Sequence, residues 1–169
     1  MPAQNISNDQ HIFGTLAKHR VPFIIIGGHA VYRHGYRRTT ADIDVVWLRS
    51  EASASALLAA LTELNAVWIG KELDPVTGIE RTYPVSLAYI NVEHLMMLWT
   101  PFGPLDLFDF IPGMPTEDVQ RLFDSGVEGD GLIFSSLSWL RKMKRAAGRT
   151  KDLADLEELG KLHAESETE

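Results

Sequence analysis

The stretch that decides the fold covers residues 24–47 and reads Ile24-Ile-Ile-Gly-Gly-His-Ala-Val-Tyr-Arg-His-Gly-Tyr-Arg-Arg-Thr-Thr-Ala-Asp-Ile-Asp-Val-Val-Trp47. Its two short apolar runs, Phe23–Ile26 and Ile43–Leu48, predict buried strands. Between them Gly27-Gly28 turns the chain, and residues 29–35 have helical character that stops at a glycine. The expected order is therefore strand, glycine turn, helix and strand.

Two carboxylates, Asp42 and Asp44, stand at the start of the second predicted strand. Because side chains alternate along a strand, both leave the same face, about 6.6 Å apart along the backbone. Their mutual repulsion is relieved by a hard divalent cation such as Mg²⁺ or Mn²⁺, which binds carboxylates together with substrate phosphates. The alternative is a strand-end turn in which the two aspartates only cap backbone groups.

The glycine turn precedes this carboxylate pair by about fifteen residues. A strand, Gly27-Gly28 and a helix start together present free backbone N–H groups, which is a site for phosphate. Glycine also lets a ligand approach the backbone closely. Alone, the pair Gly27-Gly28 is a weak signal that is more often just a tight turn, and the combination with Asp42 and Asp44 is what indicates phosphate chemistry.

The rest of the chain predicts a mixed α/β (α+β) domain with a central mixed sheet flanked by helices and a C-terminal helical segment. The expected helices are one capped by Asn8 or Asp9 and running to about Arg20, and those over residues 50–64, 136–147 and 151–163. The further expected strands cover residues 84–90, 92–99 and 105–110. We expect a single domain, residues 1–169, with a core over 1–112, a helical part over 113–163 and a frayed tail over 164–169.

Composition excludes several classes of protein. The 169 residues are 45% hydrophobic with a net charge of −7, which is typical of a globular protein and argues against one that coats long nucleic acids. The chain has no cysteine, so disulfides, thiolate metal sites and cysteine nucleophiles are ruled out. The apolar runs are too short to cross a bilayer, and the N-terminus lacks a signal-peptide pattern, so we expect a cytoplasmic protein with no membrane partner.

Three patches of the sequence resemble the nucleotidyltransferase superfamily, which has the polymerase-beta-like fold. They are Gly27–Val46, the segment Thr100-Pro-Phe-Gly-Pro-Leu-Asp106, and Lys142-Met-Lys-Arg-Ala-Ala-Gly-Arg-Thr-Lys-Asp-Leu-Ala-Asp155. More narrowly, the chain is similar to minimal bacterial nucleotidyltransferases related to abortive-infection toxins of the AbiEii type. The genes of those toxins often pair with an antitoxin gene, so the resemblance implies a possible antitoxin partner.

The resemblance implies roles for individual residues. Asp42 and Asp44 would be metal ligands, and Asp106 would complete the metal site or act as the base. Alternatively, Asp106 is only a solvated residue of the strand. Lys144 would face the triphosphate and stabilise the leaving group, whereas the alternative for the basic run around it is a solvated helix end.

The loop before Asp42 and the glycine turn complete the expected nucleotide site. Gly27, Gly28, His29, Arg38 and Thr40 are the candidate contacts to the nucleotide. At the position of His29 the superfamily commonly has serine, so this residue departs from the pattern. A histidine can contact a phosphate, and it can equally be a packed side chain.

These residues predict a metal-dependent enzyme that transfers a nucleoside monophosphate from an NTP to a hydroxyl acceptor. The acceptor would be an RNA such as tRNA, or a protein, and the sequence does not choose between them. A second hypothesis is a catalytically inactive nucleotidyltransferase-like module that acts through a partner protein. A metal-dependent phosphohydrolase is a third, but such enzymes usually add histidine ligands in a spacing that this sequence lacks.

Overall fold

The two apolar runs predicted as strands pair with each other near the centre of one sheet. Phe23–Ile25 (β1) and Ile43–Trp47 (β2) run antiparallel, with Phe23 opposite Trp47 and Ile25 opposite Val45. The computed structural model describes residues 6–164. Every residue of β1 is buried, as expected for a strand covered on both faces.

The sheet has eight strands in the order β4-β3-β5-β6-β2-β1-β8-β7. The further strands are Val67–Leu73 (β3), Glu80–Pro84 (β4), Leu95–Thr100 (β5), Gly103–Phe108 (β6), Val127–Gly129 (β7) and Leu132–Phe134 (β8). Strand β2 is parallel to β6 and β1 is parallel to β8, whereas the other neighbours are antiparallel. The sheet is therefore mixed, as the sequence predicted.

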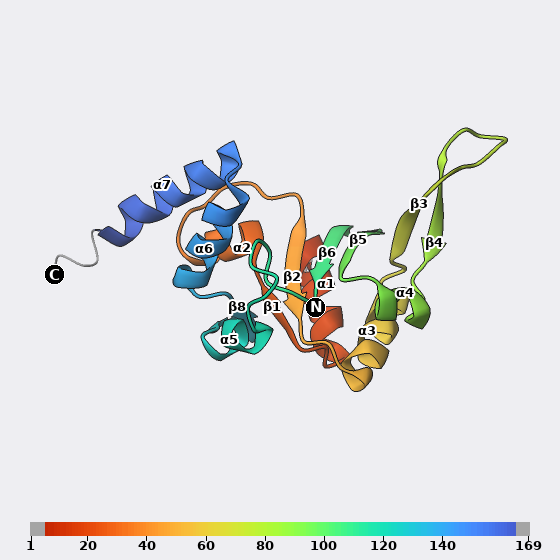
Figure 1. Ribbon diagram of the computed structural model, residues 1–169, viewed down its shortest axis with the longest axis horizontal. Helices are drawn as coiled ribbons and strands as arrows, with labels where there is room; N and C mark the ends of the chain where they lie inside the picture. Colours follow the sequence, from red (N-terminus) through yellow and green to blue (C-terminus); the bar gives the residue numbers. More distant parts are fainter. Residues whose placement is uncertain (1–5, 165–169) are drawn as a thin grey trace, which may run out of the picture.

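Seven helices connect and cover the strands within residues 6–164. They are Asn8–Lys18 (α1), Gly27–Arg33 (α2), Glu51–Glu63 (α3), Leu87–Val92 (α4), Val119–Asp124 (α5), Leu137–Ala147 (α6) and Thr150–Ala164 (α7). Figure 1 shows α6 and α7 at one end of the molecule and the β3–β4 hairpin extended at the other. None of the described helices is long and apolar enough to cross a membrane.

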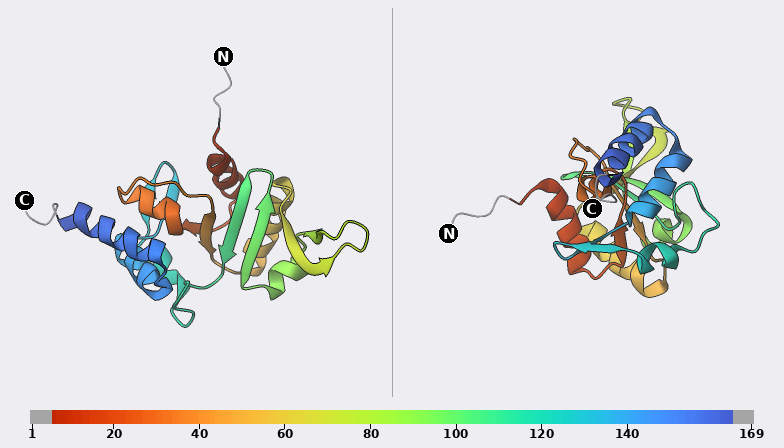
Figure 2. Two further views of the ribbon diagram at one scale, coloured as in Figure 1. Left: turned by 90° about the horizontal axis from the view of Figure 1, so that it is seen from above. Right: turned by 90° about the vertical axis from the view of Figure 1, so that its left-hand side faces the viewer.

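The two faces of the sheet are covered differently. One face packs against α1 and α3 in the main core, which contains Leu16, Val45, Leu57 and Leu107 among others. The second face is covered near β1 and β2 by α5 and α6, through a smaller cluster that includes Val46, Leu122 and Trp139. Figure 2 shows β5 and β6 lying bare in the view from above, so the second face stays open over these strands.

Local chemistry explains where the helices flanking the site begin and end. The Ser136 hydroxyl caps α6 by accepting a hydrogen bond from Trp139 N, and Gly148 ends the same helix in the left-handed conformation at φ 61°. A residue with a Cβ atom is strained there, so the glycine sets the sharp turn into α7. The turn brings α7 back alongside α6.

Several sequence predictions need correction. The predicted strand over residues 84–90 is wrong, because Pro84 ends β4 and Ser86 then caps helix α4. Strands β3, β4, β7 and β8 and helices α4 and α5 were not predicted. The part from 113 to 163 is not wholly helical, since β8 joins the central sheet beside β1. The predicted tail over 164–169 falls, from residue 165 onward, outside the described residues.

Candidate active site

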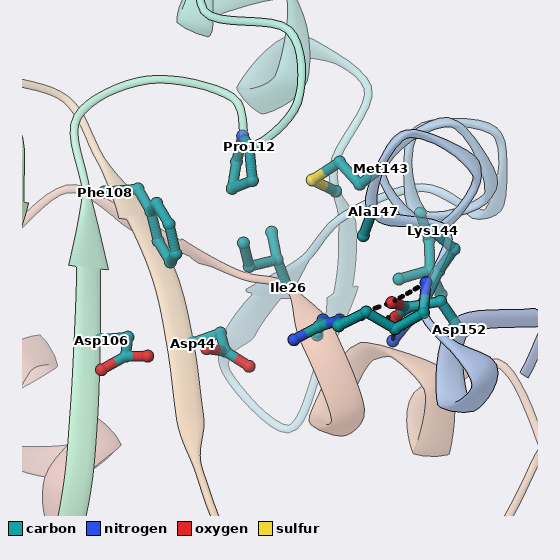
Figure 3. Close-up of a pocket in the computed structure, with 12 residues that line it drawn as sticks. Ile26, Asp44, Asp106, Phe108, Pro112, Met143, Lys144, Ala147 and Asp152 are labelled. Carbon is teal, nitrogen blue, oxygen red and sulfur yellow. Dashed lines mark hydrogen bonds and ion pairs between the residues drawn. The ribbon is translucent and has the colours of Figure 1, made fainter. Parts of the chain in front are cut away.

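Asp44 and Asp106 face each other across two neighbouring parallel strands. Their Cα atoms are register partners in the β2–β6 pair. The residues beside them in sequence, Ile43 and Leu105, are buried in the core with α1 and α3. Because side chains alternate along a strand, both carboxylates project from the opposite face. Figure 3 shows Asp44 and Asp106 side by side on this face.

Asp42 lies two residues before Asp44, in a segment without regular secondary structure, and is exposed. Burial raises the pKa of Asp44, and the negative charge of Asp42 raises it further, although Lys144 opposes the rise. Burial and the charges of Asp44 and Asp42 raise the pKa of Asp106 to about 6. The three carboxylates therefore repel one another, which is the electrostatic condition of a cation site.

Gly27 closes one side of this carboxylate pair. Its φ is 64°, a conformation that favours glycine, and an added Cβ atom would collide with the carboxylate of Asp44. At Gly28 an added Cβ would collide with the Thr40 side chain. Both glycines are thus required by close approach: the first to Asp44, the second to the loop that leads to Asp42.

A pocket opens between the carboxylates and helix α6. Its lining comprises Ile26, Gly27, Asp44, Asp106, Phe108, Pro112, Leu140, Met143, Lys144, Ala147, Arg149 and Asp152. Figure 3 shows Asp44 and Asp106 on one side and Lys144 with Asp152 on the other, while Ile26, Phe108 and Pro112 lie along the apolar wall. The pocket thus combines acidic, basic and apolar surfaces, as small-molecule sites do.

Lys144 lines the pocket, but its ammonium group already has two carboxylate partners. Lys144 Nζ lies 2.9 Å from Asp152 Oδ1 and 2.8 Å from Asp155 Oδ2, and all three side chains are almost fully buried. Burial alone would raise the pKa of Asp152, but hydrogen bonds from Arg149 and Lys144 outweigh burial and lower it. Lys144 is therefore held inside an ion cluster.

Arg149 is the more accessible cation of the pocket. Its Nε lies 2.7 Å from Asp152 Oδ2, and 69% of its side chain is exposed. Hydrogen bonding to Asp152 raises its pKa despite some burial. Asp152 thus orients Arg149 at the pocket edge.

The other predicted contacts lie around the carboxylates or apart from them. Arg38 is bound to Asp155, and Thr40 Oγ1 donates to the backbone oxygen of Asp42 at 3.3 Å. His29 does not line the pocket that contains Asp44 and Asp106. Its Nε2 lies 3.5 Å from Asp9 Oδ2, and its ring packs edge-on against Phe13. It lines two other pockets instead. Burial lowers the pKa of His29 despite the nearby Asp9 charge.

The carboxylates of Asp42, Asp44 and Asp106 are the candidate ligands for a divalent cation. Within residues 6–164 no three His, Asp or Glu side chains are close enough together to form a ready-made metal site. Asp42, Asp44 and Asp106 nevertheless supply only oxygen donors, and burial together with the neighbouring carboxylates raises the pKa values of Asp44 and Asp106. This chemistry fits Mg²⁺ or Mn²⁺, which keep waters and substrate phosphates as further ligands.

One residue of the neighbourhood received no role from sequence reasoning. Asp155 joins Arg38 to Lys144, although 117 positions separate it from Arg38. The available signal was the pair Asp152 and Asp155, which are three residues apart and so lie on one side of a helix. Their inward orientation beside α6 was not readable, since acidic residues on a helix are usually solvated.

Comparison with known proteins supports the fold. No protein-family model and no curated protein matches the chain. Among solved structures, the antibiotic-resistance factor ANT(2'')-Ia is similar, with a TM-score of 0.57 and 15% identity over 95% of this chain and 85% of the other. An antigenic nucleotidyltransferase-like protein from Paracoccidioides brasiliensis is similar with a TM-score of 0.50 and 18% identity, over 93% and 78%.

The mixed sheet with helices on both faces is therefore a nucleotidyltransferase fold. The predicted fold class is confirmed by these two structures, whose identities are low enough that they establish the fold alone. The activity has to be argued from the residues of this chain.

Proposed function

We propose that the chain is a metal-dependent nucleotidyltransferase that moves a nucleoside monophosphate from an NTP to a hydroxyl acceptor. Asp42, Asp44 and Asp106 would hold Mg²⁺ or Mn²⁺, and the nucleotide would occupy the pocket beside them. The assignment is consistent with the nucleotidyltransferase fold of the chain.

The observation that carries the proposal is that Asp44 and Asp106 are register partners at the edge of a pocket that is also lined by basic side chains. Two facing carboxylates on adjacent strands can share an ion. Arg149 and Lys144 lie across the same pocket, where positive charge would offset the charge of the phosphates. The carboxylate pair and the basic side chains opposite it together suit a phosphate ligand that is bound through a metal ion.

In the reaction, the acceptor oxygen forms a bond to the α-phosphorus while the bond from that phosphorus to the bridging oxygen breaks, releasing pyrophosphate. When bound, the metal would neutralise phosphate charge and orient the reacting oxygens. Asp106 would complete the metal site or act as the base that takes up the hydroxyl proton. The backbone at Gly27, which lines the pocket, would contact the phosphates, whereas Gly28 makes room for Thr40. Arg149 would stabilise the departing pyrophosphate.

The acceptor and the biological setting rest on the sequence resemblance. We propose an RNA such as tRNA, or a protein, as the acceptor, and an antitoxin as a partner in a toxin–antitoxin pair. The antibiotic-resistance role of ANT(2'')-Ia belongs to that protein. A cytoplasmic location is part of the same proposal.

The test is incubation of the purified protein with Mg²⁺, each labelled NTP in turn, and bacterial RNA or cell extract. We expect label on an RNA or a protein band, and its loss in the Asp42→Asn, Asp44→Asn double variant. Asp124→Asn is the matched control, because Asp124 is an exposed aspartate on α5 that lines none of this pocket.

The outcome separates this proposal from the second hypothesis. Transfer retained in the double variant would contradict the assignment of the carboxylates. An inactive module acting through a partner would bind NTP weakly or not at all in the presence of Mg²⁺. One observation favours the inactive module: the ammonium group of Lys144 is already bound to two buried carboxylates, those of Asp152 and Asp155.

A further inference from the structure

The segment that carries Asp42 has no regular secondary structure. Residues 36–42 connect α2 to β2 as an irregular loop, and its residues are half-buried or exposed. A loop of this kind is mobile unless side chains hold it. The position of Asp42 beside Asp44 therefore depends on what anchors the loop.

The loop is held from one side by α2. Gly28, near the start of that helix, lies so close to Thr40 that a Cβ atom would collide with it, and 3.4 Å would separate that Cβ from Arg38 Nη1. Thr40 Oγ1 in turn donates to the Asp42 backbone oxygen. The contact with α2 is therefore one of close packing, and the Thr40 hydrogen bond lies within the loop itself.

The second side is a forked ion pair to α7. Arg38 Nε donates to Asp155 Oδ1 at 2.6 Å, and Arg38 Nη2 donates to Asp155 Oδ2 at 2.7 Å. Its third nitrogen, Nη1, donates to Thr39 O at 3.0 Å. All three guanidinium nitrogens thus have acceptors, two of them charged, and such a bidentate pair fixes orientation as well as distance.

Asp155 is itself immobilised. It is almost fully buried and also binds Lys144 of α6 at 2.8 Å. The contact between these helices and α2 is apolar, with Ala30, Val31, Leu140 and Leu159 in one buried cluster. The anchor of the loop is therefore a rigid part of the molecule, distant in sequence from the loop.

We propose that Asp155 is a positioning residue that, through Arg38, holds the loop over residues 36–42 so that Asp42 stays beside Asp44. The consequence for metal binding rests on the proposed function, in which Asp42 is a ligand. The anchoring of the loop does not depend on that function. Arg38 then serves to hold the loop, and its guanidinium is committed to Asp155.

The first test measures the loop in the metal-free protein. Trypsin cleaves after Arg37 and Arg38, so the rate of cleavage at these two bonds, assigned by mass spectrometry, reports local opening of the loop. We expect Asp155→Asn to raise this rate about tenfold, because a charge-assisted fork is replaced by a weaker neutral contact.

The matched control is Asp109→Asn. Asp109 also has a largely buried side chain bound to an arginine, with Arg49 Nε 2.5 Å from its Oδ2, but it lies outside the loop and its anchor. This variant loses a comparable ion pair and some overall stability. It should leave cleavage after Arg37 and Arg38 at the wild-type rate under conditions where the protein is folded.

The second test measures Mn²⁺ affinity by calorimetry, without nucleotide or acceptor. Loss of a hydrogen-bond partner of a metal ligand typically weakens binding about 10–100-fold. Because Asp155 acts on Asp42 only through Arg38 and the loop, we expect a loss at or below the lower end of this range for Asp155→Asn and none for Asp109→Asn. Arg38→Lys keeps the charge and the tryptic site but lacks the fork. It supplies the same two measurements if Asp155→Asn does not fold.

The outcomes are separable from those of the transferase assay. Faster loop cleavage with weaker Mn²⁺ binding in Asp155→Asn or Arg38→Lys supports the proposal even if no acceptor is found. Unchanged cleavage in both variants overturns the anchoring. Faster cleavage with unchanged Mn²⁺ affinity overturns the positioning of Asp42, and so does an equal loss of affinity in Asp109→Asn.

Discussion

Gly27 lies directly against the carboxylate of Asp44, at the point where β1 gives way to α2. A Cβ atom on Gly27 would collide with Asp44 Oδ2, and the φ of 64° at this position already favours glycine. The turn that shapes the pocket and the carboxylate at its centre are thus packed as one unit. A change at Gly27 should affect both stability and the acidic site.

Gly27→Ala should lower the free energy of unfolding by about 1–3 kcal/mol, the usual cost of a strained backbone position, with the collision adding to it. Urea denaturation measures this change. Gly14→Ala is the control, since Gly14 lies within α1 and nothing lies within 4 Å of an added Cβ. That variant should be more stable by about 0.5–1 kcal/mol, because alanine favours helix. Equal effects at the two positions would show that the Gly27 contact is unimportant.

Asp106 should make the metal-free protein less stable as the pH rises. Its pKa is about 6 when folded against 3.8 as the ordinary value, so the folded state binds more protons between these two values. The free energy of unfolding therefore falls as pH rises through this window. Burial lowers the pKa of His29 and His34, which gives a slope of the opposite sign.

The difference between wild type and Asp106→Asn isolates the carboxylate. Urea unfolding in EDTA at pH 5 and pH 7.5 should show a smaller loss of stability with pH in the variant than in wild type. The variant should also be the more stable of the two at pH 7.5, since the repulsion among the carboxylates is reduced. A pH dependence identical in both proteins would contradict the raised pKa.

Mg²⁺ or Mn²⁺ should raise the thermal midpoint of the wild-type protein. A ligand at a hundred times its Kd stabilises the folded state by about 2.7 kcal/mol. In Asp42→Asn, Asp44→Asn the midpoint without metal should be unchanged or higher, because like charges are removed, and added metal should have no effect. Differential scanning calorimetry tests both statements, and a metal-induced shift that survives in the double variant would place the ion elsewhere.

Lys144→Met should be strongly destabilising. It leaves Asp152 and Asp155 buried with one partner fewer each, and breaking a buried pair in this way costs about 3–5 kcal/mol. Lys161→Met is the comparison, because Lys161 also binds two carboxylates, Glu157 and Glu158, but on the exposed surface of α7. Its unfolding transition in urea should coincide with that of wild type. Comparable losses in the two variants would contradict the importance of burial.

The central strands and the long helices could be predicted from local pattern. β1 and β2 are short, apolar and buried, and α6 and α7 have apolar spacing with Gly148 between them. β3 and β4 could not be recognised, because most of their residues are exposed and no alternation marks them. The strand predicted over 84–90 failed where Ser86 caps a helix, so capping outweighed apolar content.

The candidate site was predicted in part. The family resemblance placed Asp42, Asp44 and Asp106 together, and the register of the last two shows why: β2 and β6 are neighbours in the sheet. The ion pairs of Lys144 with Asp152 and Asp155 could not be predicted, because a lysine in a basic run of sequence gives no sign that it is buried or which carboxylates it binds. The Arg38–Asp155 pair links positions 117 apart, and no local pattern carries such a contact.

The Arg38–Asp155 pair also sets an order of events during synthesis. A ribosome makes the strands that carry Asp44 and Asp106 well before it makes α7, so the nascent chain can bring the two acids together while the loop before them is still untethered. The anchor arrives only when residue 155 has left the exit tunnel. A chain that stops short of that residue would have the acidic pair without its tether, so the last helix completes a site whose carboxylates are made much earlier.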